Sequence, residues 1–373
     1  MGIIDNMKNK ALFLMFLPLL LWGCGKSVYI PGQKVHFRVT SPEVKTRTAY
    51  EGTVTGGWER INWVSEEDVL RIYCAETPEK SADYKVGTVT DLSAKSSQAD
   101  IQEVGAPLTW GSEDPHTFYG MYPSPLVFAS DDPNKAAFSL TNERAEWMIP
   151  ATQTVTRVGE TSDYAPDMRY ATMLAKKVGS QDDETVNIPF SPMFNAFKFG
   201  ISAGDNDELH VTSFTLTEGG EDGVTAGHIY TAATMDSEAN AAYPLDAEKI
   251  GLVEGSTPSA TVTVDFTTLS GGSLVLTRDG GPVSFTVFTL PVNLKAVDLT
   301  FDSEETGIVR LALKEKNGPY LQFGRCKKFY LTGMTFPHAE TITVTGSEIN
   351  WNGTVGEDLY WQGAEAENIN WRN

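Results

Sequence analysis

The stretch Lys34-Val35-His36-Phe37-Arg38-Val39-Thr40 is the segment from which the fold can best be argued. Val, Phe and Val occupy every second position, and Lys, His, Arg and Thr stand between them. Successive side chains of a β-strand point to opposite faces of the sheet. This alternation therefore predicts a strand with one buried apolar face and one polar face in water. We expect residues 34–40 to form such a half-buried strand.

The same period of two recurs along the chain, while long helical periodicity is nearly absent. Further apolar positions spaced by two are Leu70, Ile72 and Cys74; Phe197, Phe199 and Ile201; Val262, Val264 and Phe266; Val283, Phe285 and Val287; Val309, Leu311 and Leu313; and Ile342 and Val344. Polar clusters at 204–207, 218–223 and 279–281 separate these runs and are typical of turns. The pattern predicts an all-β chain of antiparallel β-sandwiches. Residues 167–177 are the clearest helical candidate and fit a strand equally well.

The domain organisation is read from one polar, charged run at 179–184, which has no apolar pattern. Segments before this run are short and rich in Pro and Tyr, whereas the strands after it are regular as far as Phe336-Pro337. We therefore expect an N-terminal β-sandwich domain over 24–184, a C-terminal one over 185–337, and a tail over 338–373. The chain has 373 residues, which suits two domains of ordinary size.

The tail contains a short repeat. Glu348-Ile349-Asn350-Trp351-Asn352-Gly353 is echoed by Asp358-Leu359-Tyr360-Trp361-Gln362-Gly363, and Asn368-Ile369-Asn370-Trp371-Arg372 follows as a third copy. A spacing of ten residues accommodates a short strand and a turn. One interpretation is a terminal meander that packs its indoles on the second domain. The other is that part of the tail is an apolar strand offered to another molecule.

The N-terminal 23 residues have the pattern of an export signal. Lys8 and Lys10 precede an apolar run over 11–22, which is too short to cross a bilayer, since a span needs about 20 residues. The run ends in Leu21-Trp22-Gly23-Cys24, the form of a bacterial lipoprotein box. The pattern predicts that Cys24 is acylated and becomes the first mature residue. An ordinary secretory signal with a chance cysteine is the alternative, and Met7 is a second candidate start.

The charge distribution separates the beginning of the mature chain from the rest. The formal net charge of the whole chain is −20. Residues 24–47 nevertheless hold five basic side chains against Glu43 alone, a net charge of +4. Overall acidity argues against nucleic acid or anionic membrane surfaces as partners. The basic segment that ends at Arg47 is therefore a separable piece of sequence.

No residue pattern indicates catalysis, a metal site or a cofactor, so we expect a protein that is not an enzyme and has no cofactor. The five histidines form no metal-binding motif, and no nucleophile elbow or phosphate loop is present. A glycosidase carboxylate pair stays open as a minor alternative. Asp205-Asn206-Asp207-Glu208 is a weak calcium candidate, and a solvated turn is the favoured interpretation. Cys74 and Cys326 could form a disulfide, although buried thiols are favoured.

Several stretches in order along the chain resemble the fimbrillin family, the subunits of type V pili. They are Val35-His36-Phe37-Arg38-Val39 with the following 46–52; Ile61-Asn62-Trp63 with 68–73; Phe118-Tyr119-Gly120-Met121-Tyr122-Pro123; 194–199; and 329–337. The likeness covers nearly the whole mature chain, while the tryptophan repeat of the tail is not a feature of the family. The resemblance implies two tandem transthyretin-like sandwich domains.

The resemblance also implies a mode of assembly. Fimbrillins are exported as lipoproteins, and a trypsin-like protease cuts an N-terminal loop so that the first strand is lost. A strand from a neighbouring subunit then fills the groove. Here 34–40 would be the displaced strand, with Val35, Phe37 and Val39 on its buried face, and 41–47 the cleavable loop. Arg47 is the expected cut site, and Lys45 and Arg38 are the alternatives. Candidate donor residues are Ile342, Val344, Ile349, Trp351, Leu359 and Trp361.

The expected partners are other fimbrial subunits, which would bind by strand addition, a trypsin-like processing protease, and surface ligands of the host or of other bacteria. The expected location is the outer membrane and the cell surface, where the protein supports adhesion as part of a fimbria. A monomeric, lipid-anchored glycan-binding protein is the alternative. Its sugar platform would draw on aromatic side chains such as Trp58, Trp63, Tyr119 and Tyr122.

Overall fold

The computed structural model describes residues 30–40, 63–91, 97–219, 225–231, 250–313, 319–324, 327–335, 341–342, 345–350 and 364–365. These residues form strands and turns without an α-helix, and they include three 3-10 helices: η2 (Pro125–Val127), η3 (Met168–Tyr170) and η5 (Phe266–Thr268). The expectation of an all-β chain is confirmed. In the stretch 167–177, the short helix η3 is followed by the first residues of strand β11, so only its second part is a strand. None of the described helices has the length and hydropathy that a membrane crossing requires.

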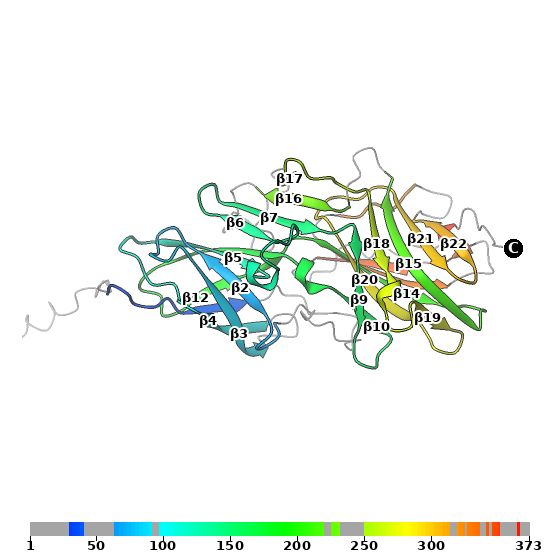
Figure 1. Cartoon of the computed structure of the whole chain (residues 1–373), viewed down its shortest axis with the longest axis horizontal. Helices are drawn as coiled ribbons and strands as arrows, with labels where there is room; N and C mark the ends of the chain where they lie inside the picture. Colours follow the sequence, from blue (N-terminus) through cyan, green and yellow to red (C-terminus); the bar gives the residue numbers. More distant parts are fainter. Residues whose placement is uncertain are drawn as a thin grey trace, which may run out of the picture.

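The first sheet has eight strands in the order β12-β1-β4-β3-β2-β5-β11-β13. Their bounds are β1 Phe37–Thr40, β2 Val69–Tyr73, β3 Ser81–Asp91, β4 Ser97–Val104, β5 His116–Tyr122, β11 Met173–Gly179, β12 Val186–Pro189 and β13 Ser191–Pro192. Strand β1 lies between two neighbours, parallel to β12 and antiparallel to β4. In Figure 1 the dark-blue β1 lies beside β12 and β4 at the left of the molecule.

Two further sheets form the other end of the molecule. The six-stranded sheet has the order β25-β23-β14-β20-β10-β9, and the larger one has the order β24-β26-β22-β21-β15-β18-β8, with β19 paired to β15. The first comprises β9 Val155–Arg157, β10 Asp163–Pro166, β14 Asn195–Ser202, β20 Val283–Thr289, β23 Lys327–Thr335 and β25 Thr345–Asn350. The second comprises β8 Thr152–Gln153, β15 Glu208–Glu218, β18 Thr261–Asp265, β19 Leu274–Thr277, β21 Val297–Ser303, β22 Gly307–Ala312, β24 Thr341–Ile342 and β26 Ala364–Glu365.

These two sheets pack face to face because the alternating apolar side chains of their strands point toward each other. Phe199 of β14 and Phe285 of β20 contact Phe214 of β15, with ring centroids 4.6 and 4.9 Å away. On β18 the buried positions are Val262 and Val264, and the alternate residues Thr261 and Thr263 are partly exposed. The period of two in the sequence therefore identified the buried face of this strand.

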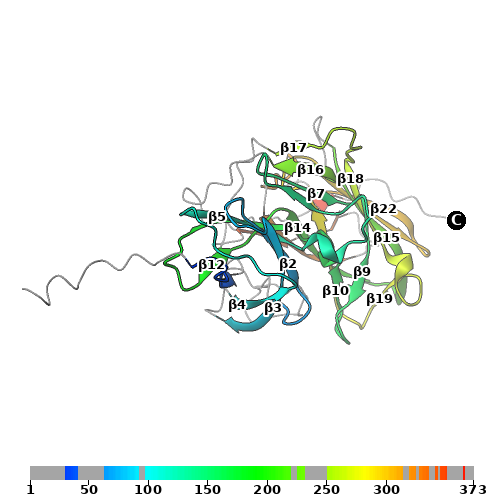
Figure 2. The ribbon, with the colours of Figure 1, turned by 60° about the vertical axis from the view of Figure 1, so that its left-hand side comes forward.

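A smaller four-stranded sheet, with the order β17-β16-β7-β6, lies along one side of the molecule (Figure 1). Its strands are β6 Ala137–Ser139, β7 Arg144–Ile149, β16 Gly227–Thr231 and β17 Ile250–Leu252. Figure 2 shows the molecule from a second direction, with β12 and β5 again at the end opposite β22 and β15. The first sheet therefore lies at one end of the molecule, and the six-stranded sheet and the sheet around β15 lie at the other.

The strands before and after residue 184, the expected end of the first domain, do not separate into different sheets. Strands β12 and β13, which come after this residue, pair with β1 and β11 of the first sheet. Strands β8 and β10, which come before it, pair with β18 and β20 at the other end. The chain therefore crosses between the two ends more than once.

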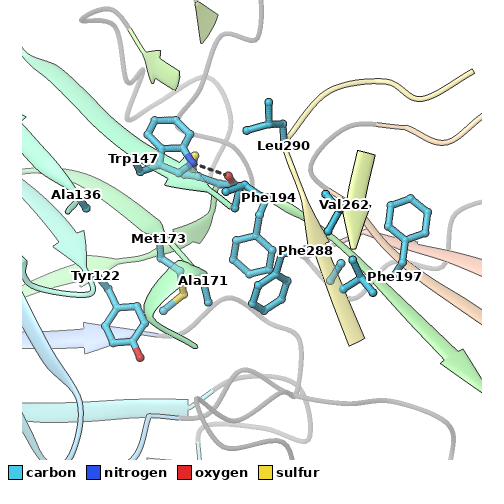
Figure 3. Close-up of a cluster of buried hydrophobic side chains, with 14 of the residues drawn as sticks. Tyr122, Ala136, Trp147, Ala171, Met173, Phe194, Phe197, Val262, Phe288 and Leu290 are labelled. Carbon is cyan, nitrogen blue, oxygen red and sulfur yellow. Dashed lines mark hydrogen bonds between the residues drawn. The ribbon is translucent and has the colours of Figure 1, made fainter. Parts of the chain in front are cut away.

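Buried side chains join the two ends (Figure 3). Phe194 contacts Phe288 of β20 in the six-stranded sheet, with ring centroids 4.6 Å apart, and Met173 of the first sheet is drawn on the other side of Phe194. The Trp147 indole N–H of β7 donates to the Met193 carbonyl at 3.2 Å. The sheets of both ends thus share one continuous apolar core.

Candidate functional site

The candidate site is the groove that the first strand fills, so its construction begins with the backbone of residues 33–40. On one side the Trp110 amide donates to the Gln33 carbonyl at 2.9 Å, and the Val35 amide donates to the Leu108 carbonyl at 3.0 Å. Further along, Arg38, Val39 and Thr40 pair with β4 in antiparallel register. This side of the strand is therefore hydrogen-bonded along most of its length.

The other side of the strand is also paired. The Val186 amide donates to the His36 carbonyl at 2.8 Å, and the Phe190 amide donates to the Thr40 carbonyl at 3.0 Å. Between these points β1 runs parallel to β12. Strand β1 is therefore internal to its sheet. If it left, β4 and β12 would face each other across a gap one strand wide, and both edges would have unpaired backbone groups.

The inward face of the strand is fully apolar. Val35 and Val39 are 0% exposed and Phe37 is 5% exposed. The Phe37 ring makes edge contacts with Tyr84 and Phe118, at centroid distances of 5.4 and 5.1 Å. The Tyr84 hydroxyl accepts a hydrogen bond from the Leu108 amide at 2.9 Å, and burial raises the pKa of this phenol. The pocket for Phe37 is thus lined by two aromatic rings, and a hydrogen bond holds that of Tyr84 in place.

The outward face of the strand is basic and meets carboxylates on β4. Lys34 Nζ lies 2.5 Å from Glu103 Oε2, and Arg38 Nε lies 2.9 Å from Asp100 Oδ1. The hydrogen bond from Lys34 holds the pKa of Glu103 below its ordinary value, and the charge of His36 acts in the same direction. The two carboxylates therefore line the β4 side of the groove. We call this pair, Asp100 and Glu103, the acidic rim.

The chain beyond the loop has buried contacts of its own. The indole of Trp63 packs edge-on against Tyr122 and Phe190, at 5.5 and 5.4 Å between centroids. Asp68 is buried and accepts hydrogen bonds from the Val64 amide at 2.6 Å and from the Tyr122 hydroxyl at 2.9 Å. Residues 41–62 are the only covalent link between the strand and this anchor.

The predicted site residues fall into three groups. Val35, Phe37 and Val39 come together on the buried face of the strand, and Arg38 lies within β1 with its guanidinium on the acidic rim. Ile342 lies in β24 and Ile349 in β25, where the backbone pairs with β26 and β23. Outside the described residues lie Cys24, Lys45, Arg47, Val344, Trp351, Leu359 and Trp361.

Two parts of the site were missed in the sequence analysis. The basic residues at alternate positions of 34–38 indicate that a neighbouring strand has acidic side chains. The acidic rim could have been predicted from this pattern. No local signal marks β12 as the parallel partner of β1, because the two strands are about 150 positions apart.

The structure gives little support to the alternative interpretations, a sugar-binding platform and a metal site. Trp63, Tyr119 and Tyr122 are at most 5% exposed and belong to the core, and Trp58 lies outside the described residues. In the described part of the chain, no three His, Cys, Asp or Glu side chains converge as metal ligands. At the weak calcium candidate, Arg278 pairs with Asp207 at 3.1 Å and donates to the Asp205 carbonyl.

The thiol of Cys74 is buried, and Cys326 lies outside the described residues. The Cys74 thiol donates to Glu76 Oε2 at 3.1 Å. Burial, followed by this hydrogen bond, raises the pKa of Cys74 to about 12. Cys74, which directly follows β2, is therefore expected to be a poor nucleophile.

Comparison with known proteins found similar chains among the solved structures alone. No family model matches the chain, and no curated protein matches it. A solved candidate cell adhesion protein from Bacteroides ovatus is similar, with 12% identity and a TM-score of 0.48, and the match covers 91% of this chain and 100% of that one.

Two other solved structures are similar over comparable lengths. A fimbrial assembly protein from Parabacteroides distasonis has 9% identity and a TM-score of 0.35, with 87% of this chain and 98% of that one covered. The tip fimbrial protein Mfa3 from Porphyromonas gingivalis has 8% identity and a TM-score of 0.33, with 85% and 100% covered.

Proposed function

We propose that this protein is a structural subunit of a cell-surface fimbria, whose first strand is cut away and replaced by a strand from a neighbouring subunit. It is made as a lipoprotein on Cys24, carries two transthyretin-like sandwich domains, and supports adhesion as part of the fibre. The proposal includes no enzymatic activity and no cofactor. The observation that carries it is the position of β1, an internal strand joined to the rest of the chain through one segment.

Loss of the first strand removes much of the stabilising free energy of the first sheet, so another strand has to replace it. Burial of Val35, Phe37 and Val39 contributes about 5–9 kcal/mol, at roughly 1.5–3 kcal/mol for each side chain. The backbone bonds to β4 and β12 add about 0.5–1.5 kcal/mol net each. A groove with two open edges and an apolar floor favours capture of another strand by β-augmentation.

The loop is the expected point of processing. Pro42 and the charges around it suit an exposed turn that a protease can enter, and Arg47 ends the basic segment. A cut there leaves the downstream chain held by the Trp63 anchor, while the upstream strand keeps only non-covalent bonds. The tail, with its alternating Ile and Trp positions, is the proposed donor to a neighbouring subunit.

Limited trypsin treatment of the purified precursor, followed by N-terminal sequencing, tests the processing step. We expect a single early cut that leaves Thr48 as the new N-terminus. The Arg47→Gln variant should move the cut to Lys45, or to Arg60 within the same segment. If 41–62 resists while described strands are cut first, the processing scheme is wrong.

Gel filtration of the cut protein tests assembly. The intact precursor serves as the control and should remain a monomer, because its groove is filled. Cut protein mixed with a strand donor should elute as a larger species. A cut protein that keeps its first strand and stays monomeric with every donor contradicts the proposal. Mass spectrometry of the precursor from cells tests the lipid on Cys24.

A further inference from the structure

The polar side of the groove has a chemistry that limits which strand can enter. The first strand places Lys34 and Arg38 outward, four residues apart, and both pair with the acidic rim. Without that strand, Glu103 and Asp100 would both lie along the open edge of β4, and neither would have its basic partner. An incoming strand with acidic side chains at those two positions would meet like charges.

The apolar floor sets a second requirement. It accepts three side chains in alternation, at the positions of Val35, Phe37 and Val39, with an aromatic ring in the centre against Tyr84 and Phe118. A strand that provides only two apolar side chains leaves a cavity or buries a polar group in the third position, and either outcome weakens binding.

The tail of this chain meets neither requirement well. Two apolar residues spaced by two are followed by glycine in three segments: Ile342 and Val344 before Gly346, Ile349 and Trp351 before Gly353, and Leu359 and Trp361 before Gly363. A register shifted by two places Glu340, Ser347 or Glu357 in the third position instead. Each of these segments therefore fills two of the three apolar positions.

The charges of the tail are also unfavourable. Residues 338–373 contain six carboxylate side chains and one basic residue, Arg372. The outward neighbours of the paired apolar residues include Glu348 and Asp358, whereas the first strand has Lys34 and Arg38 there. Only the last copy has a cation, Arg372, next to its aromatic residue Trp371. The third inward position of this copy is polar in either register, because it is Asn373 or Glu367.

We propose that the acidic rim selects the replacement strand, and that its occupant is a basic strand donated by a different protein rather than the tail of a second copy of this chain. The donor has apolar side chains at three alternate positions, aromatic in the centre, and Lys or Arg at the two positions that Lys34 and Arg38 hold. This inference rests on the proposed function. It implies a fibre in which unlike subunits follow one another, since this chain's donor and acceptor do not match.

Peptide binding to the loop-cut full-length protein tests this selection. The reference probe is a fluorescent peptide with the sequence of residues 33–40, and its counterpart carries Lys34→Glu and Arg38→Glu. Two further probes have the sequences of residues 347–353 and 357–363. Binding is followed by fluorescence anisotropy at low and high salt.

We expect the reference peptide to bind on the order of fivefold or more tightly than its charge-reversed counterpart at low salt, because each exposed ion pair changes affinity by about 1.5- to fivefold. The difference should shrink toward unity near 1 M salt. The two tail peptides should bind at least about tenfold more weakly than the reference peptide, since they lack both the cations and the third apolar side chain.

Matched variants assign the effect to the acidic rim. In the Asp100→Asn, Glu103→Gln protein, the reference and charge-reversed peptides should differ by no more than about twofold. The Glu254→Gln, Asp279→Asn protein, which changes two exposed carboxylates elsewhere, should keep the wild-type difference. Equal binding of reversed and reference peptides, or equal binding of a tail peptide, would overturn the selection while leaving strand replacement standing. If no peptide enters, the proposed function fails, and this inference fails with it.

Discussion

At the scale of single residues, Phe37 decides how firmly the first strand is held. Its ring is 5% exposed and is enclosed by Tyr84 and Phe118, whereas the neighbouring His36 is exposed. Both residues belong to the same short segment, so a change in either leaves the backbone bonds of the strand in place. Comparing them separates apolar burial from backbone pairing.

Replacement of Phe37 by alanine should lower the free energy of unfolding by about 3–5 kcal/mol, the usual cost of removing a buried phenyl ring. Chemical denaturation of the intact precursor measures this loss. The His36→Ala variant is the control and should stay within about 0.5 kcal/mol of wild type. Equal effects of the two substitutions would contradict the assigned burial.

His116 provides a second residue-scale prediction, based on pH. Its side chain is 0% exposed, and Nε2 accepts a hydrogen bond from the Gly111 amide at 2.9 Å. Burial lowers the pKa of His116, and the nearby charges of Glu76, Asp114 and Glu113 oppose this shift only in part. The unfolded chain therefore takes up the proton first as the pH falls below about 6.5.

The melting temperature should thus be nearly constant above pH 6.5 and fall between pH 6.5 and 5, before most carboxylates titrate. The His116→Gln variant should show a smaller fall over this interval, because no imidazole remains to be protonated. A wild-type melting temperature that rises on acidification through this interval would show that the sign is wrong.

At the scale of elements, β5 has to approach the link between β12 and β13 closely. Gly120 of β5 faces the ring of Phe190, and a Cβ atom at this position would lie 2.6 Å from Phe190 Cζ. The ring cannot move away easily, since Trp63 packs against it. The amide of Phe190 in turn holds the carbonyl of Thr40 at the end of β1. Packing of β5 and retention of the first strand are therefore connected.

The Gly120→Ala variant should lose about 1–3 kcal/mol of stability through overpacking. It should also release the first strand faster after the loop is cut, because Phe190 has to shift. Denaturation and mass spectrometry of the released segment measure the two effects. Gly219→Ala is the matched control, since the nearest atom to its Cβ is an ordinary contact at 3.4 Å. Normal stability of Gly120→Ala would show that the ring is free to move.

At the scale of the whole molecule, the buried cluster around Phe194 makes the two ends one folding unit. Phe194 is 1% exposed, and its ring meets Phe288 of the six-stranded sheet, while Met173 of the first sheet lies close by (Figure 3). Because the chain also crosses between the ends several times, neither end has a self-contained set of strands. We therefore expect the two ends to unfold together.

Wild-type protein should accordingly unfold in one transition that is the same by tryptophan fluorescence and by far-ultraviolet circular dichroism. The Phe194→Ala variant should shift both signals together, with a loss of about 3–5 kcal/mol. Val275→Ala, at a half-exposed position on β19, serves as the control and should change little. Two separated transitions in the wild type would indicate that the ends fold independently.

Much of the fold class could be predicted because it depends on local periodicity. The alternation in 34–40 identified Val35, Phe37 and Val39 as a buried face, and the structure confirms this burial. The clearest helical candidate was ambiguous because three residues of 3-10 helix precede a strand there. Pairing was harder to predict, since alternation reveals which face of a strand is buried and contains no information about its neighbours.

The sequence by itself determined that the chain is all-β, which side chains of the first strand are apolar, and that a basic segment precedes an acidic body. Only the tertiary structure decided that β1 is an internal strand between β4 and β12, and that Asp100 and Glu103 form the rim of its groove. The physical reason is that burial follows a period of two within one strand. Strand order and charge pairing instead depend on contacts between residues that are far apart in the chain.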